Sequence, residues 1–339
     1  MKAIAYHNFG SPDVLQCEDI EKPVPKGVLI KVRAASVNPL DRGELKGVPF
    51  IFRIVSGLRK PEATRPGRPG VDVAGLVEAV GRNVTQFKPG DEVFGVCISN
   101  PHNSGVKVWV HEQGAFAEYA CAPESTLVLK PDNVTFEQAA AVPMAALTAL
   151  QGLRDKGHIQ PGQKVLIHGA GGGVGTFAVQ IAKSFGADVT GVSRTSSVEM
   201  VRSIGADQVI DYIHEDFTKS GQHYDLIFDC YANHPLSAYR RILKPRGIYV
   251  GISAPPTGGG IAILNRLIQM LVFSQLTSRK LFTFLAKPSK DDLIILRDLM
   301  ATGKITPVID KRYRLSEIPE AIRYLEEGHA RGKVVITLE

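Results

Sequence analysis

The chain has 339 residues, 44% hydrophobic and 22% charged, with a net charge of +6 and a pI near 9.0. This length predicts two domains, and the composition excludes a disordered or fibrous protein. The basic residues form no run and do not alternate with aromatic residues, so we expect no nucleic-acid partner. The N-terminus lacks the apolar core of a secretory signal, and the four cysteines are scattered, so we expect a cytoplasmic protein.

Short apolar runs separated by glycine and proline fill residues 1–125. Punctuation of this kind predicts a β-rich first domain, folded as a partly open barrel. The expected strands are 28–33, 75–80, 92–96 and 117–120.

The pattern changes after residue 125, where strands begin to alternate with helices. Thr135 is expected to cap a helix, and 196–199 has the spacing of a capping box before a later helix. The alternation predicts an α/β domain with a parallel sheet over residues 126–287. Its expected strands are 164–168, 189–193, 208–211, 226–229, 248–252 and 280–285.

A glycine-rich turn, Gly169-Ala-Gly-Gly-Gly-Val-Gly175, follows the first of these strands. A helix is expected from Val174, with Gly186 as its stop. Such a turn is tight, lets a ligand approach the backbone, and leads into a helix N-terminus with unpaired N–H groups. It predicts a dinucleotide site, in which the main chain of Gly171, Gly172, Gly173 and Val174 holds the pyrophosphate. The alternative is a structural turn in an unrelated α/β fold.

The residues after the second strand of this sheet indicate which dinucleotide is bound. An acidic residue there would bind the ribose of NAD, but the chain has Ser193 and Arg194. Their hydroxyl and guanidinium suit a 2′-phosphate, which predicts NADPH. The alternative is that Arg194 is only a solvated residue. Ile252 and Ser253 follow the fifth strand and are expected to border the nicotinamide.

The C-terminal segment 288–339 is expected to return to the first domain. It contains expected helices at 290–302 and 316–327 and a last strand at 333–338. Before it, the apolar stretch 261–273 is too short and too polar to span a bilayer. The basic pI and the amphipathic region 261–285 leave a peripheral membrane role open.

Motifs in a fixed order cover nearly the whole chain. They are Ser36-Val-Asn-Pro-Leu-Asp41, Gly75-x-Val-x-x-Val-Gly81, Pro89-Gly-Asp-Glu-Val-Phe-Gly95, Gly114-Ala-Phe-Ala-Glu-Tyr119, Ala145-Ala-Leu-Thr-Ala149 and Gly328-His-Ala-Arg-Gly-Lys-Val-Val335. In these motifs the chain resembles the zinc-free quinone oxidoreductase branch of the medium-chain dehydrogenase/reductase superfamily. The resemblance implies a GroES-like substrate domain, a Rossmann domain with a doubly wound parallel sheet, and a homodimer that pairs the last Rossmann strands.

The resemblance also assigns roles to single residues. Thr148 matches a position near the nicotinamide, Tyr212 a tyrosine at the adenosine phosphate, and Lys333 a lysine that reaches the cofactor. A purely structural role remains the alternative for each of these three. Zinc-binding relatives have a cysteine in place of Asn38 and a Gly-His-Glu in place of 70–72, so we expect no zinc.

A site without a metal favours an acceptor that disperses the arriving charge in its own conjugated system. We therefore predict an NADPH-dependent reductase of quinones or activated alkenes. Asn38 is expected to donate a hydrogen bond to the oxygen that gains charge, and Asp41 to order its loop rather than act as an acid. The alternatives are a 2-alkenal or enone reductase and a non-catalytic NADPH-binding protein with a structural or RNA-binding role.

Overall fold

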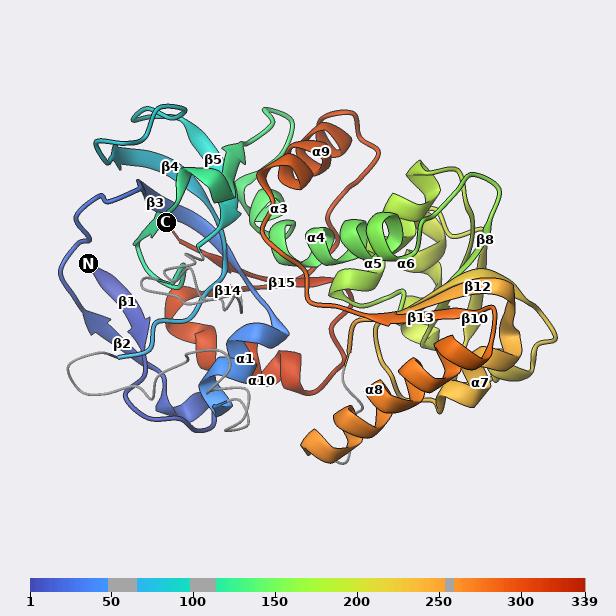
Figure 1. Ribbon diagram of the computed structural model, residues 1–339. Helices are drawn as coiled ribbons and strands as arrows, with labels where there is room; N and C mark the ends of the chain where they lie inside the picture. Colours follow the sequence, from blue (N-terminus) through green and yellow to red (C-terminus); the bar gives the residue numbers. More distant parts are fainter. Residues whose placement is uncertain (48–65, 98–113, 254–258, 339) are drawn as a thin grey trace. The chain divides into compact units, whose positions relative to one another are not determined.

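The computed structural model describes residues 1–47, 66–97, 114–253 and 259–338, which fall into two compact units (Figure 1). Unit 1 comprises Met1–Met144, Pro288–Gly303 and Pro307–Glu339, and unit 2 comprises Ala145–Lys287 with Lys304–Thr306. Unit 1 extends beyond residue 125 because the next strand and helix of the chain pack on its sheet.

Unit 1 is built on a seven-stranded sheet with the order β14-β15-β3-β4-β5-β7, in which β6 also pairs with β3. Its strands are β3 (Val28–Val37), β4 (Asp72–Val80), β5 (Glu92–Val96), β6 (Tyr119–Ala122), β7 (Leu127–Leu129), β14 (Ile309–Arg314) and β15 (Lys333–Thr337). A separate pair consists of β1 (Lys2–Ala5) and β2 (Gln16–Asp19). The C-terminal strand belongs to unit 1, where β15 pairs antiparallel with β3.

The helices of unit 1 are mostly short. They are η1 (Pro12–Val14), α1 (Pro39–Lys46), η2 (Glu124–Thr126), α3 (Phe136–Ala140), α9 (Lys290–Ala301), η6 (Leu315–Glu317) and α10 (Ile318–Glu326). The predicted cap of α3 is confirmed, since the Thr135 hydroxyl accepts from the Gln138 N–H at 3.2 Å. Gly303 follows α9 with φ +70, the left-handed conformation that ends a helix.

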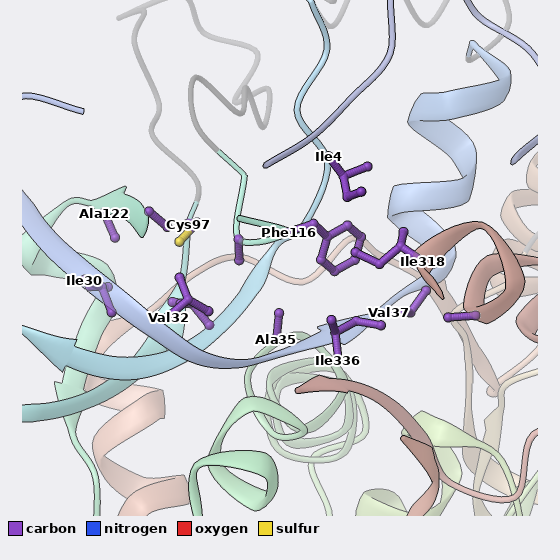
Figure 2. Packing of buried hydrophobic residues seen from close by; sticks show 14 of the residues in the cluster. Ile4, Ile30, Val32, Ala35, Val37, Cys97, Phe116, Ala122, Ile318 and Ile336 are labelled. Atoms are coloured by element: carbon purple, nitrogen blue, oxygen red, sulfur yellow. The ribbon is translucent and has the colours of Figure 1, made fainter. Parts of the chain in front are cut away.

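The core of unit 1 lies between its sheet and α10. Figure 2 shows Val37 of β3 and Ile336 of β15 near Phe116 and Ile318, with Ala35 and then Val32 further along β3. These side chains are almost completely removed from solvent. Burying each large apolar side chain contributes about 1.5–3 kcal/mol to folding, so this core fixes β3 and β15 side by side.

Unit 2 contains the predicted parallel sheet, with the order β10-β9-β8-β11-β12-β13. All six expected strands form: β8 (Lys164–His168), β9 (Asp188–Ser193), β10 (Gln208–Asp211), β11 (Tyr224–Asp229), β12 (Leu243–Gly251) and β13 (Lys280–Thr283). The strand order reverses between β8 and β11. Ligands of such sheets bind beyond the carboxyl ends of the strands at this reversal.

The helices of unit 2 connect these strands. They are α4 (Pro143–Gln151), which begins two residues before the unit, η3 (Gly152–Lys156), α5 (Gly173–Ser184), η4 (Thr195–Ser197), α6 (Val198–Ser203), η5 (Phe217–Lys219), α7 (Leu236–Ile242) and α8 (Gly259–Leu276). Gly186 follows the end of α5 with φ +78, as predicted. In the described parts of the chain, none of the helices combines the length and hydropathy that a membrane crossing needs.

The capping box predicted at 196–199 is wrong. Ser197 is the N-cap of α6 and its side chain makes no capping hydrogen bond. Glu199 therefore stands at the second helical position, where it cannot reach back to the cap, and instead pairs with Arg202 at 2.7 Å.

Candidate functional site

The turn after β8 contains glycines that packing requires and one that it does not. A Cβ on Gly175 would lie 2.0 Å from the carbonyl oxygen of Gly169, so the fold accepts only glycine there. At Gly172, the N-cap of α5, the nearest atom to a Cβ would be 3.5 Å away. The structure thus leaves free space beside Gly172, as a turn that receives a ligand does.

The N-terminus of α5 presents main-chain donors. Its first helical hydrogen bond runs from the N–H of Thr176 to the carbonyl of Gly172, so the N–H groups of Gly173 and Val174 precede the helical ladder. Both residues are partly exposed, whereas Gly171 is buried beside Ser197. The N–H of Gly172 already donates to Gly169 at 3.1 Å. The available donors therefore centre on Gly173 and Val174.

The structure brings the three residues expected at the adenosine phosphate to one edge of unit 2. Ser193 ends β9, and its carbonyl accepts from the N–H of Tyr212 at 3.0 Å. Arg194 is half-buried, and none of the carboxylates in the described ranges lies within 4.0 Å of its guanidinium. Burial raises the pKa of Tyr231, and the positive charge of Arg194 opposes that shift. A guanidinium without a carboxylate partner suits a phosphate.

A buried carboxylate, which the sequence analysis missed, anchors the carboxyl end of β11. Asp229 accepts from the main-chain N–H of Tyr231 at 2.9 Å and from the hydroxyl of Tyr249 at 2.6 Å, and His168 lies 2.9 Å away. Burial alone would raise the pKa of Asp229, but these hydrogen bonds and the His168 charge lower it overall. The ionised group thus orders the chain where β11 ends. An acidic residue after a buried apolar run is the signal that identifies it.

The residues expected at the nicotinamide lie next to this anchor. Ile252 donates its N–H to the carbonyl of Asp229 at 3.0 Å, and the Ser253 hydroxyl donates to the carbonyl of Cys230 at 2.6 Å. The ends of β11 and β12 are thereby tied together. Thr148 lies half-buried on α4, with an interaction of its own.

A cavity of about 320 Å³ lies at the same strand ends in unit 2. Tyr212 contributes to its wall, together with His168, Ile213, His214, Glu215, Asp216, Phe217, Asn233 and His234. Its size is within the range of small-molecule sites. The sequence analysis did not find it, because its wall combines segments after three separate strands.

A buried polar cluster forms the candidate site of unit 1. Asn38 caps α1, and its main-chain N–H donates to Asp41 at 2.7 Å. The other carboxylate oxygen of Asp41 accepts from the N–H of Gly70 at 3.1 Å. Asp41 therefore orders two loops. Asp72, at the start of β4, accepts from the Ser36 hydroxyl at 2.7 Å and from the Asn38 amide at 2.9 Å.

Lys333 completes this cluster from β15. Its ammonium donates to the amide oxygen of Asn38 at 2.7 Å and lies 3.6 Å from the carboxylate of Asp72. The residue is only 3% exposed. Burial lowers the pKa of Lys333, and the charges of Asp72 and Asp41 oppose that shift. The structure thus places a cation beside the residue expected to stabilise charge.

The hydrogen-bond count constrains what Asn38 can donate. Its amide has two N–H groups, and these donate to Asp72 at 2.9 Å and to the carbonyl of Ser36 at 3.2 Å. A substrate oxygen would therefore have to displace one of them. The Lys333 ammonium has three N–H groups and one short bond, since its contact with Val37 is 3.4 Å long. Two of the three Lys333 N–H groups thus have only the longer contacts, with the Val37 carbonyl and with Asp72 at 3.6 Å, whereas both N–H groups of Asn38 have partners within 3.2 Å.

In the parts of the chain that the structure describes, no three His, Cys, Asp or Glu side chains converge in the manner of a metal site. The buried cluster around Asn38 holds the carboxylate of Asp72 and the ammonium of Lys333. An ammonium group is not a metal ligand while it is protonated.

Comparison with known proteins gives matches over the whole chain. Residues 24–132 match the family described as "Alcohol dehydrogenase GroES-like domain", and residues 204–336 match "Zinc-binding dehydrogenase". An "NADPH-dependent alkenal/one oxidoreductase, chloroplastic" of Arabidopsis thaliana is 34% identical over 99% of this chain and 79% of its own length. The "Chloroplast envelope quinone oxidoreductase homolog" of the same plant is 32% identical over 99% and 98%. The structure of the quinone oxidoreductase from Coxiella burnetii has a TM-score of 0.81 and 31% identity, covering 100% and 99% of the two chains.

Proposed function

The chain belongs to the quinone oxidoreductase branch of the medium-chain dehydrogenase/reductase superfamily, and we propose that it is an NADPH-dependent reductase of quinones or activated alkenes that works without zinc. The names of its relatives, an alkenal/one oxidoreductase and quinone oxidoreductases, support this activity. We base the zinc-free mechanism on the buried contact of Lys333 with Asn38, since zinc-binding relatives have a cysteine at the position of Asn38.

Unit 2 provides the residues for the dinucleotide. When bound, NADPH supplies a hydride from its nicotinamide ring. The N-terminus of α5 offers its main-chain donors to the pyrophosphate, and Gly172 leaves room for it. Arg194 and Ser193 take the 2′-phosphate, while Ile252 and Ser253 form the border for the nicotinamide.

Unit 1 provides the charge that a reduced acceptor requires. A quinone or enone gains negative charge on oxygen during reduction, and a prearranged cation or hydrogen-bond donor stabilises it. We propose that Lys333 is this cation and that Asn38 holds its ammonium in place through the 2.7 Å bond. Asp41 keeps the Asn38 loop ordered. Solvent supplies the final proton.

The first test is a panel of acceptors with NADPH and NADH, followed at the absorbance of the reduced nicotinamide. We expect turnover with quinones and enones and little with simple ketones or aldehydes, because these concentrate charge on one oxygen without a metal to receive it. A chelator should leave the rate unchanged. Loss of activity with chelator and recovery with Zn²⁺ would contradict the proposal. Failure with every acceptor, together with salt-sensitive RNA binding, would favour a non-catalytic role.

Changing Arg194 to Asp is expected to raise the KM for NADPH by about ten- to a hundredfold, the value of charged hydrogen bonds to a phosphate. The KM for NADH should change little, because NADH has no 2′-phosphate. Steady-state kinetics with both cofactors measure the difference. Arg202→Asp, the same charge change on the exposed face of α6, is the matched control. Equal increases for both cofactors in Arg194→Asp would rule out the phosphate contact.

A homodimer and a cytoplasmic location are part of this proposal. The outer edge of β13 is available for pairing, because β13 is the last strand of its sheet. The four cysteines are free thiols, which a reducing compartment maintains. Light scattering of the purified protein and imaging of the tagged chain in its own cells test the two points.

A further inference from the structure

The imidazole of His168 is buried at the end of β8, directly before the glycine turn. The residue is 3% exposed, and its ring centroid lies 4.9 Å from that of Phe217. Its Nδ1 lies 2.9 Å from a carboxylate oxygen of Asp229 and 2.9 Å from the hydroxyl of Tyr239. A polar ring in such a place needs hydrogen-bond partners, and His168 shares its partner carboxylate with the turn that follows β11.

The proton of this pair can be placed on the imidazole. Burial raises the pKa of Asp229, but its hydrogen bonds with His168 and Tyr249 lower the pKa overall, so the carboxylate is ionised. An ionised carboxylate only accepts hydrogen bonds, and the Nδ1 of His168 must therefore carry the hydrogen between them. This bond fixes the tautomer of His168 and the orientation of both side chains.

The pair joins the two strands between which the order of the sheet reverses. His168 and Asp229 are partners in the last register pair of β8 and β11. The N–H of Cys230 donates to the carbonyl of His168 at 3.0 Å, and the N–H of Ile252 donates to the carbonyl of Asp229 at 3.0 Å. The pair thus lies between the glycine turn, which is expected to hold the pyrophosphate, and Ile252, which is expected at the nicotinamide.

The turn after β11 depends on the same carboxylate. Asp229 accepts from the N–H of Tyr231 at 2.9 Å and from the N–H of Ala232 at 3.0 Å. Ala232 has φ +55, a left-handed conformation that is unfavourable for residues other than glycine, so this turn needs support. It places the ring of Tyr231 against the glycine turn, since a Cβ on Gly169 would lie 2.9 Å from that ring.

Two further side chains hold the other oxygen of Asp229. The hydroxyl of Tyr249 donates to it at 2.6 Å, and the guanidinium of Arg266 lies 3.6 Å away. Arg266 also donates to the Tyr249 hydroxyl at 2.6 Å. A buried polar network with its partners in place has one arrangement, and here that arrangement sets the position of the Asp229 carboxylate.

We propose that His168 and Asp229 are positioning residues for the dinucleotide, which hold the ends of β8 and β11 and the turn 230–232 in the arrangement that binds NADPH. This inference rests on the proposed NADPH-dependent reductase activity. His168 orients the carboxylate, and the carboxylate holds the N–H groups of the turn. A site that is ordered before binding loses less conformational freedom when the ligand arrives, so the pair raises affinity without contact to the cofactor.

Three substitutions of His168 test which of its nitrogens matters. The side-chain amide of Asn can take the place of the Nδ1–H, whereas the amide of Gln reaches the position of Nε2. We expect His168→Leu and His168→Gln to raise the Kd for NADPH about tenfold or more, because the turn loses its defined position. His168→Asn should bind like the unchanged protein. Titration of the fluorescence of the reduced nicotinamide measures the Kd, and kcat at saturating NADPH should change far less. Equal losses in His168→Asn and His168→Leu would overturn the proposal.

Tyr249→Phe is a milder change that keeps the ring and removes one donor to Asp229. It should raise the Kd for NADPH about tenfold, the value of a hydrogen bond to a charged group. Tyr224→Phe is the matched control, because Tyr224 is equally buried at the opposite end of β11, where its hydroxyl donates to Gln222 at 3.0 Å. This control should leave the Kd unchanged even where it lowers stability. Equal Kd values for the two variants would show that the network is structural only.

Hydrogen exchange of the cofactor-free protein separates this inference from the proposed activity. Peptides that cover the turn 230–232 should exchange faster in Tyr249→Phe and His168→Leu than in the unchanged protein, because the N–H groups of Tyr231 and Ala232 lose a fixed acceptor. Faster exchange with an unchanged Kd for NADPH would show that the pair orders the turn but does not serve the dinucleotide. An unchanged protein that binds neither NADPH nor NADH would contradict the reductase activity itself, and the positioning role would fall with it.

Discussion

Changing Lys333 to Met is expected to lower the free energy of unfolding by about 3–5 kcal/mol, the cost of removing one partner from a buried ion pair. Met fills a similar volume but carries no charge and no hydrogen-bond donor. The carboxylate of Asp72, which is fully buried, would lose the cation 3.6 Å away, and the amide oxygen of Asn38 would lose its donor. Urea unfolding followed by circular dichroism measures the change.

The double variant Lys333→Met with Asp72→Asn tests whether the pair is the cause. Asn carries no charge, so the double variant should lose less than the sum of the two single changes, with a coupling of about 1–3 kcal/mol. Lys304→Met, at an exposed lysine, should stay within about 0.5 kcal/mol of the unchanged protein. Additive losses would show that Lys333 stabilises unit 1 independently of Asp72.

The pH dependence of the same substitution gives a second readout. Burial lowers the pKa of Lys333 in the folded protein, whereas the unfolded chain keeps a lysine pKa of about 10.4. Between these two values the unfolded state binds more protons, so the stability of the lysine protein relative to Lys333→Met should rise with pH there. Below the lowered pKa the difference should be constant. A difference that falls with alkaline pH would contradict the assigned direction.

The strands and the glycine turn were predictable from the sequence because their signals are local. Each strand of unit 2 contains an apolar run, and the glycine turn lies within seven consecutive residues. The end of α5 is fixed in the same way, since Gly186 adopts a conformation that glycine favours.

The contacts of the site were not predictable in this way, because they join distant parts of the chain. Lys333 meets Asp72 only because β15 and β4 both pair with β3. Asp229 similarly joins side chains from β8 and β12, and no pattern along the sequence indicates those partners. The partners of the Asn38 amide are contacts of the same kind. The sequence predicted Asn38 as a hydrogen-bond donor, but only the fold shows that both of its N–H groups already have acceptors.

A sequence motif also does not tell which of its glycines serve packing and which serve a ligand. Gly175→Ala is expected to destabilise unit 2 by about 3 kcal/mol or more, because the new Cβ meets the carbonyl oxygen of Gly169 at 2.0 Å and the main chain of Ala170 at 2.8 Å. The helix would have to move away from β8 to relieve this overlap. Thermal or urea unfolding measures the loss directly, with and without NADPH.

Gly172→Ala is the matched change in the same turn, and its expected result is the opposite one. Gly172 has φ −87, which alanine adopts readily. The atom nearest to the added Cβ would be the carbonyl oxygen of Gly169, 3.5 Å away. The stability of the free protein should therefore stay within about 1 kcal/mol of the original. The added methyl group would occupy the space where a pyrophosphate approaches the backbone, so the Kd for NADPH should rise about tenfold or more. If Gly172→Ala binds NADPH normally while Gly175→Ala unfolds, the turn serves packing alone and the dinucleotide must bind elsewhere.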